Sequence, residues 1–533
     1  MNFLASTSMK SLFMLTTLTL ALPSQASEDN RDLEQQAQKL MAERCIGCHT
    51  KNDDGSWRRI SEQRKTPEGW LMNLVRMQKI RGAYLTTEER DLLVKYLSDT
   101  QGLAPEETAD YRYILERREN TPENWQDPNF GEMCARCHSG ARVAIQRRSE
   151  AEWKRNIHFH LGQWTSTEYS YQGRDREWFK IAEEITTPLL AQRYPLHSEA
   201  WNEWQQHPKA ELQGRWRWLG HQPGRGNYEG YLTIEGGEKD QYRLSFEGRY
   251  LDGEEVTGTG SAVLYTGYEW RASITLNGVQ QQQVMALSKD GMRLSGRMFV
   301  ADENEKGTDL QLDRSDAPRI MGIYPAHVKS GSEAQLTIVG HNLDGNILLP
   351  ESLSVIEELE RSAGRITLRV AASADQTTHR APIAVGEAGG ELVIYKNIDS
   401  VAVEPAYGVA RVGGGHTPKV HGIFEAVGIA AGNDGLIGSE DDIRIGYFPA
   451  KWSVEPFDEI AKHDHDVDFA GTMNADTGVF TPGDAGPNPK RRFSTNNAGN
   501  LKVVAEVADG DKTLKGDGRM VVTVQRWNNS PIR

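Results

Sequence analysis

The spacing of hydrophobic residues changes near residue 210. Before that point, between residues 28 and 200, apolar positions recur at helical intervals, as in DNRDLEQQAQKLMAERC at 29–45, and this spacing predicts helices. After it, apolar and polar residues alternate between glycine-rich turns, as Tyr242, Leu244 and Phe246 do, and a period of two is typical of strands. The pattern therefore predicts a helical N-terminal part followed by a longer β part.

The β part separates into three stretches. About eight short strands fill residues 206–316 and follow one another through tight turns, which predicts an up-and-down antiparallel barrel. The stretch 317–397 opens with PRIMGIYPAHVKSGSEAQLTIVGHNL at 318–343, and its apolar–Pro–Gly–strand order resembles an immunoglobulin-like domain of the IPT/TIG kind. The last stretch, 398–533, carries strands around long polar loops and is predicted to be a second sandwich.

Residues 1–26 have the pattern of a secretory signal peptide. Lys10 precedes the apolar run SLFMLTTLTLAL, which is short for a membrane span, and PSQA offers small residues before a cleavage point after Ala26. A retained membrane anchor is the alternative interpretation. We expect the mature chain to be exported to the periplasm. The net charge of the full sequence, −14, argues against nucleic acid and an anionic membrane surface as partners.

All four cysteines of the chain lie in two copies of Cys-x-x-Cys-His, AERCIGCHT at 42–50 and EMCARCHSG at 132–140. This order is the attachment pattern of c-type haem, because two thiols add to the haem vinyl groups and the next residue presents an imidazole to the iron. A redox or zinc motif would leave each histidine unexplained. The sequence therefore predicts two covalently bound haem c groups, with Cys45, Cys48 and His49 at the first and Cys134, Cys137 and His138 at the second.

The haem region contains an internal repeat. A helix signal follows each haem motif, TPEGWLMNLVRM at 66–77 and SEAEWKRNIHFH at 149–160, and aligning Trp70 with Trp153 places Asn73 on Asn156. Both helix signals begin with a capping residue. The region thus resembles two tandem copies of one small cytochrome unit.

The repeat identifies candidates for the sixth iron ligands. Seven residues after each tryptophan stand Met77 and His160, and methionine and histidine are the usual sixth ligands of haem iron. Met72 competes with Met77 but has no suitable counterpart in the second copy. His158 competes with His160, and at most one of these two can face the iron because helical residues two apart point to different faces.

The two proposed ligand sets imply different haem potentials. A thioether such as that of Met77 favours Fe(II) and raises the potential, relative to two imidazoles such as those of His138 and His160. Electrons should therefore enter at the second haem and leave from the first.

These patterns together predict the fold class and the domain order. We expect a multidomain chain in which an N-terminal all-α dihaem cytochrome c domain is followed by three all-β domains, an antiparallel barrel and two immunoglobulin-like sandwiches. The predicted boundaries are 1–26 for the signal peptide, 27–205 for the cytochrome domain with units of about 27–105 and 106–205, 206–316 for the barrel, 317–397 for the first sandwich and 398–533 for the second.

The combination of these features is similar to the α subunit of quinohaemoprotein amine dehydrogenase. The discriminating parts are the helix signal that ends in Met77, its copy that ends in His160, and the barrel segments NYEGYLTIEGG and AVLYTGYEWR. The resemblance covers nearly all of the mature chain. It implies an oxidoreductase in which this chain is one subunit of a periplasmic αβγ heterotrimer, beside a β-propeller subunit and a small γ subunit.

The resemblance also implies a division of chemistry. The γ subunit would carry a cysteine tryptophylquinone and the catalytic base, so that a primary amine is oxidised to an aldehyde and ammonia on the partner. Electrons would then pass through the two haems of this chain to a soluble blue copper protein or cytochrome c. No catalytic residue is expected in this chain, and we find no nucleophile–base pair in it. The alternatives are a dihaem c-type peroxidase, which needs one open iron, and a stand-alone periplasmic dihaem electron carrier.

Overall fold

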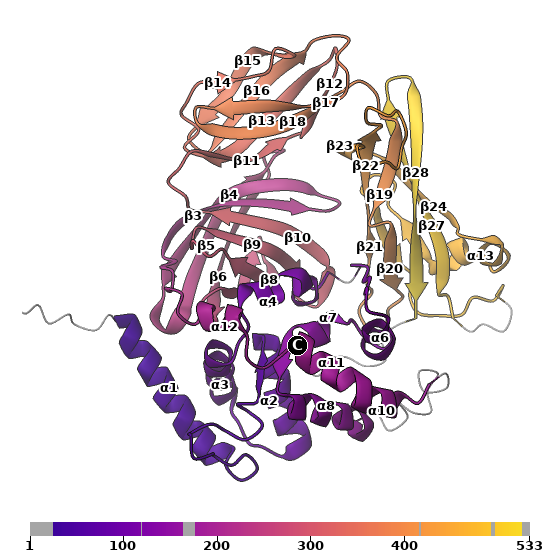
Figure 1. Cartoon of the computed structure of the whole chain (residues 1–533). Helices are drawn as coiled ribbons and strands as arrows, with labels where there is room; N and C mark the ends of the chain where they lie inside the picture. Colours follow the sequence, from indigo (N-terminus) through magenta and orange to yellow (C-terminus); the bar gives the residue numbers. More distant parts are fainter. Residues whose placement is uncertain (1–24, 119, 164–175, 415–416, 492–495, 525–533) are drawn as a thin grey trace, which may run out of the picture.

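The computed structural model describes residues 25–118, 120–163, 176–414, 417–491 and 496–524. The proposed signal peptide lies almost wholly outside these residues. Figure 1 shows helices gathered below a barrel, one β unit above the barrel and another along its side.

Among the helices that the structure describes, none is both long enough and apolar enough to cross a membrane.

The N-terminal region is only partly helical, so the prediction of an all-α domain is wrong. Two strands, β1 (Gln63–Lys65) and β2 (Gln146–Arg148), pair in an antiparallel sheet, and long turns separate the helices. The helices are α1 (Gln25–Arg44), α2 (Pro67–Arg81), α3 (Thr87–Thr100), α4 (Pro105–Thr108), α5 (Arg112–Leu115), α6 (Pro128–Phe130), α7 (Ala141–Ala144), α8 (Glu150–Gln163), α10 (Trp178–Ile181), α11 (Thr187–Arg193) and α12 (Glu199–Trp204), with short 3-10 or π turns η1 (Ala109–Tyr111), η2 (Gly131–Ala135) and η3 (Ala182–Thr186).

The departure from helix has a local and a tertiary cause. The segment 50–62 is rich in Asn, Asp, Gly and Ser, whose side chains compete with helical hydrogen bonds and favour turns. Among the described strands, β1 pairs with β2, which lies in the other unit of the internal repeat. Hydrophobic periodicity within one segment cannot reveal such a pairing, because the partner is distant in the sequence.

Local sequence signals set the ends of α2 and α3, the two helices that follow the first Cys-x-x-Cys-His motif. Thr66 caps α2 by accepting the backbone N–H of Gly69, Pro67 fits the first turn, and Gly82 ends the helix with a φ of 72°. Helix α3 begins with a capping box in which Thr86 and Glu89 satisfy each other's backbone N–H groups. These ends fix the length of α2, the helix that carries Met77.

The second part of the chain is a closed antiparallel barrel, in agreement with the predicted architecture. Each strand pairs with its sequence neighbours, and the first strand closes against the last. Trp216, Trp218 and Trp270 fill the interior and are fully buried. The strands are β3 (Gly214–Gln222), β4 (Gly226–Gly236), β5 (Gln241–Tyr250), β6 (Glu255–Tyr265), β7 (Glu269–Leu276), β8 (Val279–Leu287), β9 (Arg293–Val300) and β10 (Glu303–Asp313).

The third part packs two four-stranded sheets around one core. One sheet has the order β11-β13-β16-β15 and the other β12-β18-β17-β14. Leu336 and Ile366 of the first sheet and Leu392 of the second belong to the same buried cluster. The strands are β11 (Arg319–Tyr324), β12 (His327–Lys329), β13 (Glu333–His341), β14 (Ile347–Leu348), β15 (Leu353–Ser362), β16 (Arg365–Ala372), β17 (His379–Val385) and β18 (Ala388–Tyr395).

The fourth part is also built of sheets that share a core. Its sheets have the orders β19-β22-β23, β20-β28-β27-β24 and β21-β26-β25, and Val403, Phe480 and Leu501 meet in one buried cluster. The elements are β19 (Ser400–Glu404), β20 (Tyr407–Arg411), β21 (Gly422–Ile423), β22 (Glu425–Ala430), β23 (Ile443–Phe448), β24 (Lys451–Pro456), α13 (Glu459–His463), α14 (Asp466–Ala470), β25 (Gly471–Met473), β26 (Val479–Pro482), β27 (Gly499–Asp509) and β28 (Lys512–Thr523).

The barrel contacts each of the other parts. Towards the helical region, Arg271 pairs with Glu68 at 2.6 Å, and Trp204 of α12 donates its indole N–H to the carbonyl of Thr266 at 2.7 Å. Towards the fourth part, His221 lies 2.9 Å from a carboxylate oxygen of Glu425. The barrel is therefore the central body of the chain (Figure 1).

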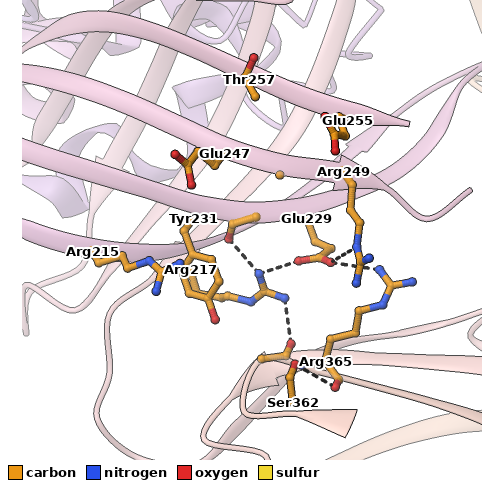
Figure 2. Close-up of a pocket in the computed structure, with 13 residues that line it drawn as sticks. Arg215, Arg217, Glu229, Tyr231, Glu247, Arg249, Glu255, Thr257, Ser362 and Arg365 are labelled. Atoms are coloured by element: carbon orange, nitrogen blue, oxygen red, sulfur yellow. Dashed lines mark hydrogen bonds and ion pairs between the residues drawn. The ribbon is translucent and has the colours of Figure 1, made fainter. Parts of the chain in front are cut away.

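Towards the third part, the barrel forms a polar seam beside a cleft of about 470 Å³. Figure 2 shows Arg217 of β3 and Arg365 of β16 converging on Glu229 of β4. The ion-pair distances are 2.6 Å from Arg217 and 3.0 Å from Arg365, and Arg217 also donates to the carbonyl of Gly364 at 2.8 Å. The buried guanidinium groups of this seam thus have carboxylate partners within the chain.

Candidate haem-binding site

The first Cys-x-x-Cys-His motif continues from the end of α1 as a single tight turn. The carbonyl of Cys45 accepts the backbone N–H of Cys48 at 3.1 Å and that of His49 at 2.9 Å. The imidazole of His49 hydrogen-bonds through Nδ1 to the carbonyl of Arg58 at 3.1 Å. Since a carbonyl can only accept, the proton is on Nδ1, and Nε2 keeps its lone pair for a metal.

The second motif begins in the π turn η2, which contains Cys134. His138 hydrogen-bonds through Nδ1 to the carbonyl of Ser139 at 2.9 Å, so its Nε2 also keeps a lone pair. Burial lowers the pKa of His138, which favours the neutral imidazole that ligates a metal. Burial raises the pKa of the Cys134 thiol to about 12. The four cysteines are all free of disulfide bonds.

Helix α8 presents His160 and His158 in different environments. His160 is half-buried and hydrogen-bonds through Nδ1 to the carbonyl of Asn156 at 2.7 Å, which leaves Nε2 available. His158 is exposed, and its Nε2 lies 3.2 Å from a carboxylate oxygen of Glu183. Besides burial, the charges of Arg142 and His160 contribute to the lowering of the pKa of His138.

Helical spacing places Met77 on the face of α2 that turns toward the first motif. Trp70 and Leu74 belong to a buried cluster against which Cys45 packs, and Met77 follows them at helical spacing on the same face. The sulfur of the rival Met72 instead accepts a hydrogen bond from Arg76 at 3.0 Å and lies 3.9 Å from the guanidinium of Arg142. The arrangement favours Met77 over Met72 as a donor toward the first motif.

The second unit repeats this geometry. Trp153 and Ile157 belong to two buried clusters, and Cys134 packs against both. His160 follows Ile157 by three residues and lies on the same face of α8. In each unit, one thiol (Cys45 or Cys134) packs against an apolar wall, and helical spacing places a second donor (Met77 or His160) on the helix face that carries this wall. The histidine of each motif keeps its Nε2 available. This donor set fits a haem c group.

The strands that join the two units also belong to the repeat, which sequence reasoning missed. Gln63-Arg64-Lys65 and Gln146-Arg147-Arg148 are separated by the same number of residues as Trp70 and Trp153. Extending the alignment a few residues before each tryptophan would have found them. In the antiparallel pair, Arg64 lies opposite Arg147, and Gln63 lies opposite Arg148. The two units therefore meet about an approximate two-fold axis at the arginine pair.

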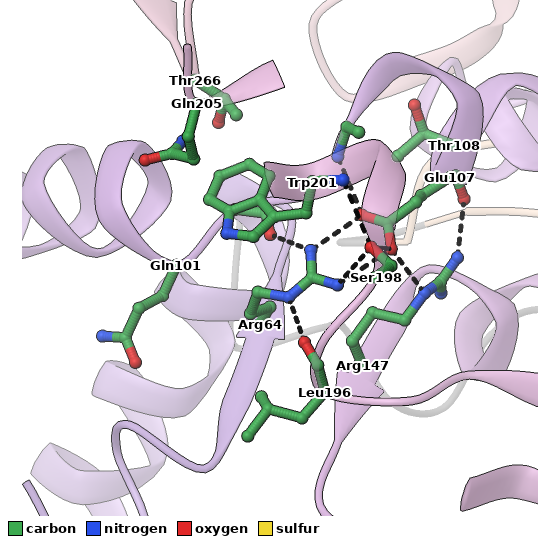
Figure 3. A network of polar contacts seen from close by, with 12 residues as sticks. Arg64, Gln101, Glu107, Thr108, Arg147, Leu196, Ser198, Trp201, Gln205 and Thr266 are labelled. Atoms are coloured by element: carbon green, nitrogen blue, oxygen red, sulfur yellow. Dashed lines mark hydrogen bonds and ion pairs between the residues drawn. The ribbon is translucent and has the colours of Figure 1, made fainter. Parts of the chain in front are cut away.

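A buried carboxylate sits on this axis. Figure 3 shows Glu107 between the guanidinium groups of Arg64 and Arg147. Arg64 makes a bidentate contact at 2.8 and 2.9 Å, and Arg147 donates from Nε at 2.9 Å. Although burial opposes ionisation, these hydrogen bonds and charges hold the pKa of Glu107 below its ordinary value. Glu107 thus joins the two units at their centre.

One further cluster has the residue types of a metal site. Among the described residues, Glu303, Glu305 and His421 place donor atoms within 4.8 Å of one another. The ammonium of Lys306 contacts Glu303, and His421 hydrogen-bonds through Nδ1 to Glu305 at 3.0 Å. These groups already satisfy one another, so we assign no metal to them.

Comparison with protein families gives four matches in succession along the chain. Residues 35–201 match the family described as "Quinohemoprotein amine dehydrogenase A, alpha subunit, haem binding". Residues 209–315, 317–396 and 401–532 match domains II, III and IV of the same alpha subunit. No curated protein matches the chain.

Solved structures resemble the chain only weakly. The redesigned β-barrel mFAP1 bound to DFHBI is 18% identical with a TM-score of 0.17, and the alignment covers 19% of this chain and 94% of that chain. The Bacteroides ovatus protein SGBP-B, in complex with a mixed-linkage heptasaccharide, is 12% identical with a TM-score of 0.20, covering 59% of this chain and 64% of that chain. Zebrafish RET cadherin-like domains 1 to 4 are 9% identical with a TM-score of 0.17, covering 52% and 62%.

Proposed function

The chain belongs to the alpha-subunit family of the quinohemoprotein amine dehydrogenases, and from this premise we propose that it is the electron-transfer subunit of such an enzyme. The family match makes it a subunit of an oxidoreductase with a haem-binding N-terminal domain. The single observation that carries the proposal is the repeated donor set: in each unit one motif cysteine, Cys45 or Cys134, packs against an apolar cluster, and helical spacing places Met77 or His160 on the helix face that contributes to that cluster.

We propose that this chain holds two covalently bound haem c groups. Cys45 and Cys48 would attach the first, with His49 and Met77 as iron ligands, and Cys134 and Cys137 would attach the second, with His138 and His160 as iron ligands. The Nδ1 hydrogen bonds of the three histidines support these roles, because each leaves Nε2 for the metal. When bound, haem supplies reversible one-electron chemistry at iron.

The proposal extends to the partners of the chain. A β-propeller subunit and a small subunit bearing cysteine tryptophylquinone would complete a periplasmic αβγ heterotrimer, and the small subunit would oxidise the primary amine to an aldehyde and ammonia. A soluble blue copper protein or cytochrome c would accept the electrons. The contrast between the thioether of Met77 and the imidazole of His160 supports entry at the second haem and exit from the first.

The test is anaerobic reduction by substrate. The complex is purified from its native source, a simple primary amine is added without oxygen, and the haem absorption spectrum is recorded. We expect the absorption spectrum to change from that of oxidised haem to that of reduced haem during manual mixing of the amine with the protein. A tertiary amine of similar size is the matched control, because its nitrogen carries no hydrogen and it cannot form a neutral imine. Dithionite gives the spectrum of the fully reduced haems as a reference.

The possible outcomes separate the candidate functions. If the primary amine reduces the haems and the tertiary amine does not, the result supports a chain that receives electrons from an amine-oxidising quinone. Haems that respond to dithionite and stay oxidised with every amine would contradict the proposal and favour a stand-alone carrier. Haems that are reoxidised by hydrogen peroxide at turnover rates would favour a dihaem peroxidase.

A further inference from the structure

The interface between the two haem units carries more positive than negative side chains. Around strands β1 and β2 the charged residues interact in one continuous set. Its bases are Arg59, Arg64, Lys65, Arg76, Arg142, Arg147, Arg148 and Arg155, and its carboxylates are Glu62, Glu107 and Glu152. Arg59, Arg142 and Arg155 are open to solvent. Buried charges are costly unless they are paired, so an unpaired cation among the other bases favours an anion from outside the chain.

The carboxylates are already shared among some of these bases. Glu107 serves Arg64 and Arg147, at distances of 2.8 and 2.9 Å. Glu152 is contacted by Arg59 at 2.9 Å and by Arg155 at 2.8 Å, and Arg148 is 3.6 Å away. Within the described part of the chain, no ion pair to a carboxylate reaches the remaining three bases, which are Lys65, Arg76 and Arg142.

Lys65 shows the imbalance most clearly. Its side chain is buried, with 3% of the residue exposed, and its Nζ donates to the side-chain oxygen of Gln146 at 2.7 Å. The same oxygen accepts from Arg148 at 2.9 Å. The Nε of Arg148 is buried and has no hydrogen-bond partner in the described part of the chain. An ammonium has three N–H donors. The Gln146 oxygen, which is neutral and also accepts from Arg148, satisfies only one of the donors of Lys65.

Arg76 and Arg142 lie next to the proposed iron ligands. Arg76 precedes Met77, and its guanidinium stands 5.1 Å from the ring of Phe159, which precedes His160. Both Arg76 and Arg142 approach the sulfur of Met72. The guanidinium of Arg76 therefore reaches from α2 to α8, the two helices that carry the proposed ligands Met77 and His160.

We propose that Lys65, Arg76 and Arg142 form a carboxylate-binding site at the interface of the two units, and that its ligands are the propionate groups of the haems. This inference rests on the proposed function only in requiring that both motifs hold haem. Each haem carries two propionates, and a guanidinium binds a carboxylate through two parallel hydrogen bonds. The propionates supply the missing negative charge beside the iron ligands, where the excess of bases lies.

The site has a consequence for the haem potentials. A fixed positive charge near the iron favours Fe(II) over Fe(III), because the reduced iron carries less positive charge. In the chain alone, burial and the charges of Arg148 and Arg76 lower the pKa of Lys65 well below its ordinary value, and we expect a neighbouring propionate to keep its ammonium charged. Replacing Lys65 by a neutral residue then removes that charge and leaves a propionate without its partner. Both changes lower the midpoint potential of the haem concerned.

The experiment is a spectroelectrochemical titration of the intact complex that carries Lys65→Met. We expect at least one haem midpoint potential to fall, and Lys65→Arg to restore most of the shift because it keeps the charge. Arg59→Gln is the matched control, since it removes a base of the same set that already pairs with a carboxylate, Glu152. Its shift should be clearly smaller. Arg142→Gln is the second test variant, because Arg142 lies at an exposed position where folding tolerates substitution, and it should lower a potential as well.

The result that would overturn the inference is a full complement of haem with unchanged potentials in both Lys65→Met and Arg142→Gln. Shifts no larger than that of Arg59→Gln would overturn it equally. If the wild-type complex carries haem but is not reduced by amine, the proposed function fails while the potentials still decide this inference. A wild-type complex that is purified without haem absorption would overturn both.

Discussion

At the scale of single residues, hydrogen bonding at Nδ1 distinguishes the histidines. The Nδ1–H of His160 donates a hydrogen bond to the carbonyl of Asn156, which leaves Nε2 available. His158, in contrast, is exposed and pairs with Glu183. Only the difference in face could be predicted from the sequence, because residues two apart on a helix point apart. Which face turns inward depends on the packing of Trp153 and Ile157, and the sequence does not contain that information directly.

Replacing each of these histidines should give different spectra. We expect His160→Ala to remove one axial ligand and convert the second haem to a high-spin, five-coordinate state, while His158→Ala leaves the haem spectrum unchanged. Electron paramagnetic resonance of the oxidised complex measures the spin state directly. A high-spin signal in His158→Ala, with none in His160→Ala, would show that the ligand is His158 and that our assignment of His160 is wrong.

The two methionines of α2 allow a parallel comparison. Met77→His should replace a thioether by an imidazole and lower the higher of the two haem potentials, because two imidazoles stabilise Fe(III) relative to imidazole and thioether. Met72→Leu keeps the volume and serves as the control. A redox titration checks both variants, and the assignment is wrong if Met72→Leu moves the potential further than Met77→His does.

Glu107 is the residue whose loss should be most costly to the haem region. Glu107→Gln removes the charge that Arg64 and Arg147 share, in a site where both guanidinium groups are buried. We expect a loss of about 3–5 kcal/mol in the free energy of unfolding, since removing one partner leaves buried charges uncompensated.

Denaturant unfolding of the full chain measures this loss, and the neighbouring Glu106→Gln provides the control. Glu106 is 47% exposed at its side chain and pairs with Lys289 alone, so its replacement should change stability by less than about 1 kcal/mol. Equal losses in the two variants would show that the shared carboxylate is unimportant.

At the scale of elements, the sequence predicts those structures whose signals are local. The alternation of Tyr242, Leu244 and Phe246 places three side chains in the barrel core, and all three are buried. The capping residues Thr66 and Ser149 begin α2 and α8. Each of these signals lies within the element that it specifies, and a short stretch of sequence is therefore enough to read it.

Elements that depend on distant partners were not predicted. Strands β1 and β2 are three residues each, too short to show a period, and they consist of glutamine and basic residues. They are strands because they pair with each other, not because their residues prefer that conformation. This is why the helical region was overestimated, and why the bases at its centre were not recognised as part of the candidate site. The domain boundaries given above stay predictions.

At the scale of the whole molecule, two histidine–carboxylate contacts join the barrel to the fourth part. His221 contacts Glu425, and His421 contacts Glu305. Burial opposes protonation of His221, but the hydrogen bond and charge of Glu425 outweigh it, so the pKa of His221 is raised above its ordinary value. The stabilisation from this pair is fully present below the ordinary histidine pKa of about 6.5 and is lost as the pH rises through the raised pKa.

This sign predicts how the attachment of the fourth part depends on pH. Hydrogen–deuterium exchange of β22, compared between the wild type and His221→Gln at each pH, isolates the contribution of the pair. We expect faster exchange in the variant at pH 6 and a difference that disappears as the pH rises above the raised pKa of His221. A difference that stays constant as the pH rises would contradict a role for the protonated imidazole.

The pairing of β1 with β2 also sets the order in which the chain can mature. Synthesis proceeds from the N-terminus, so β1 emerges with its polar backbone edge open, and its partner exists only once Gln146–Arg148 has been made. Until then Arg64 lacks its counterpart Arg147, although Glu107 is already available. The first unit cannot complete its fold on the growing chain before the second arrives. The two units therefore mature as a pair, and a truncated chain that ends before residue 146 should be a target for proteolysis.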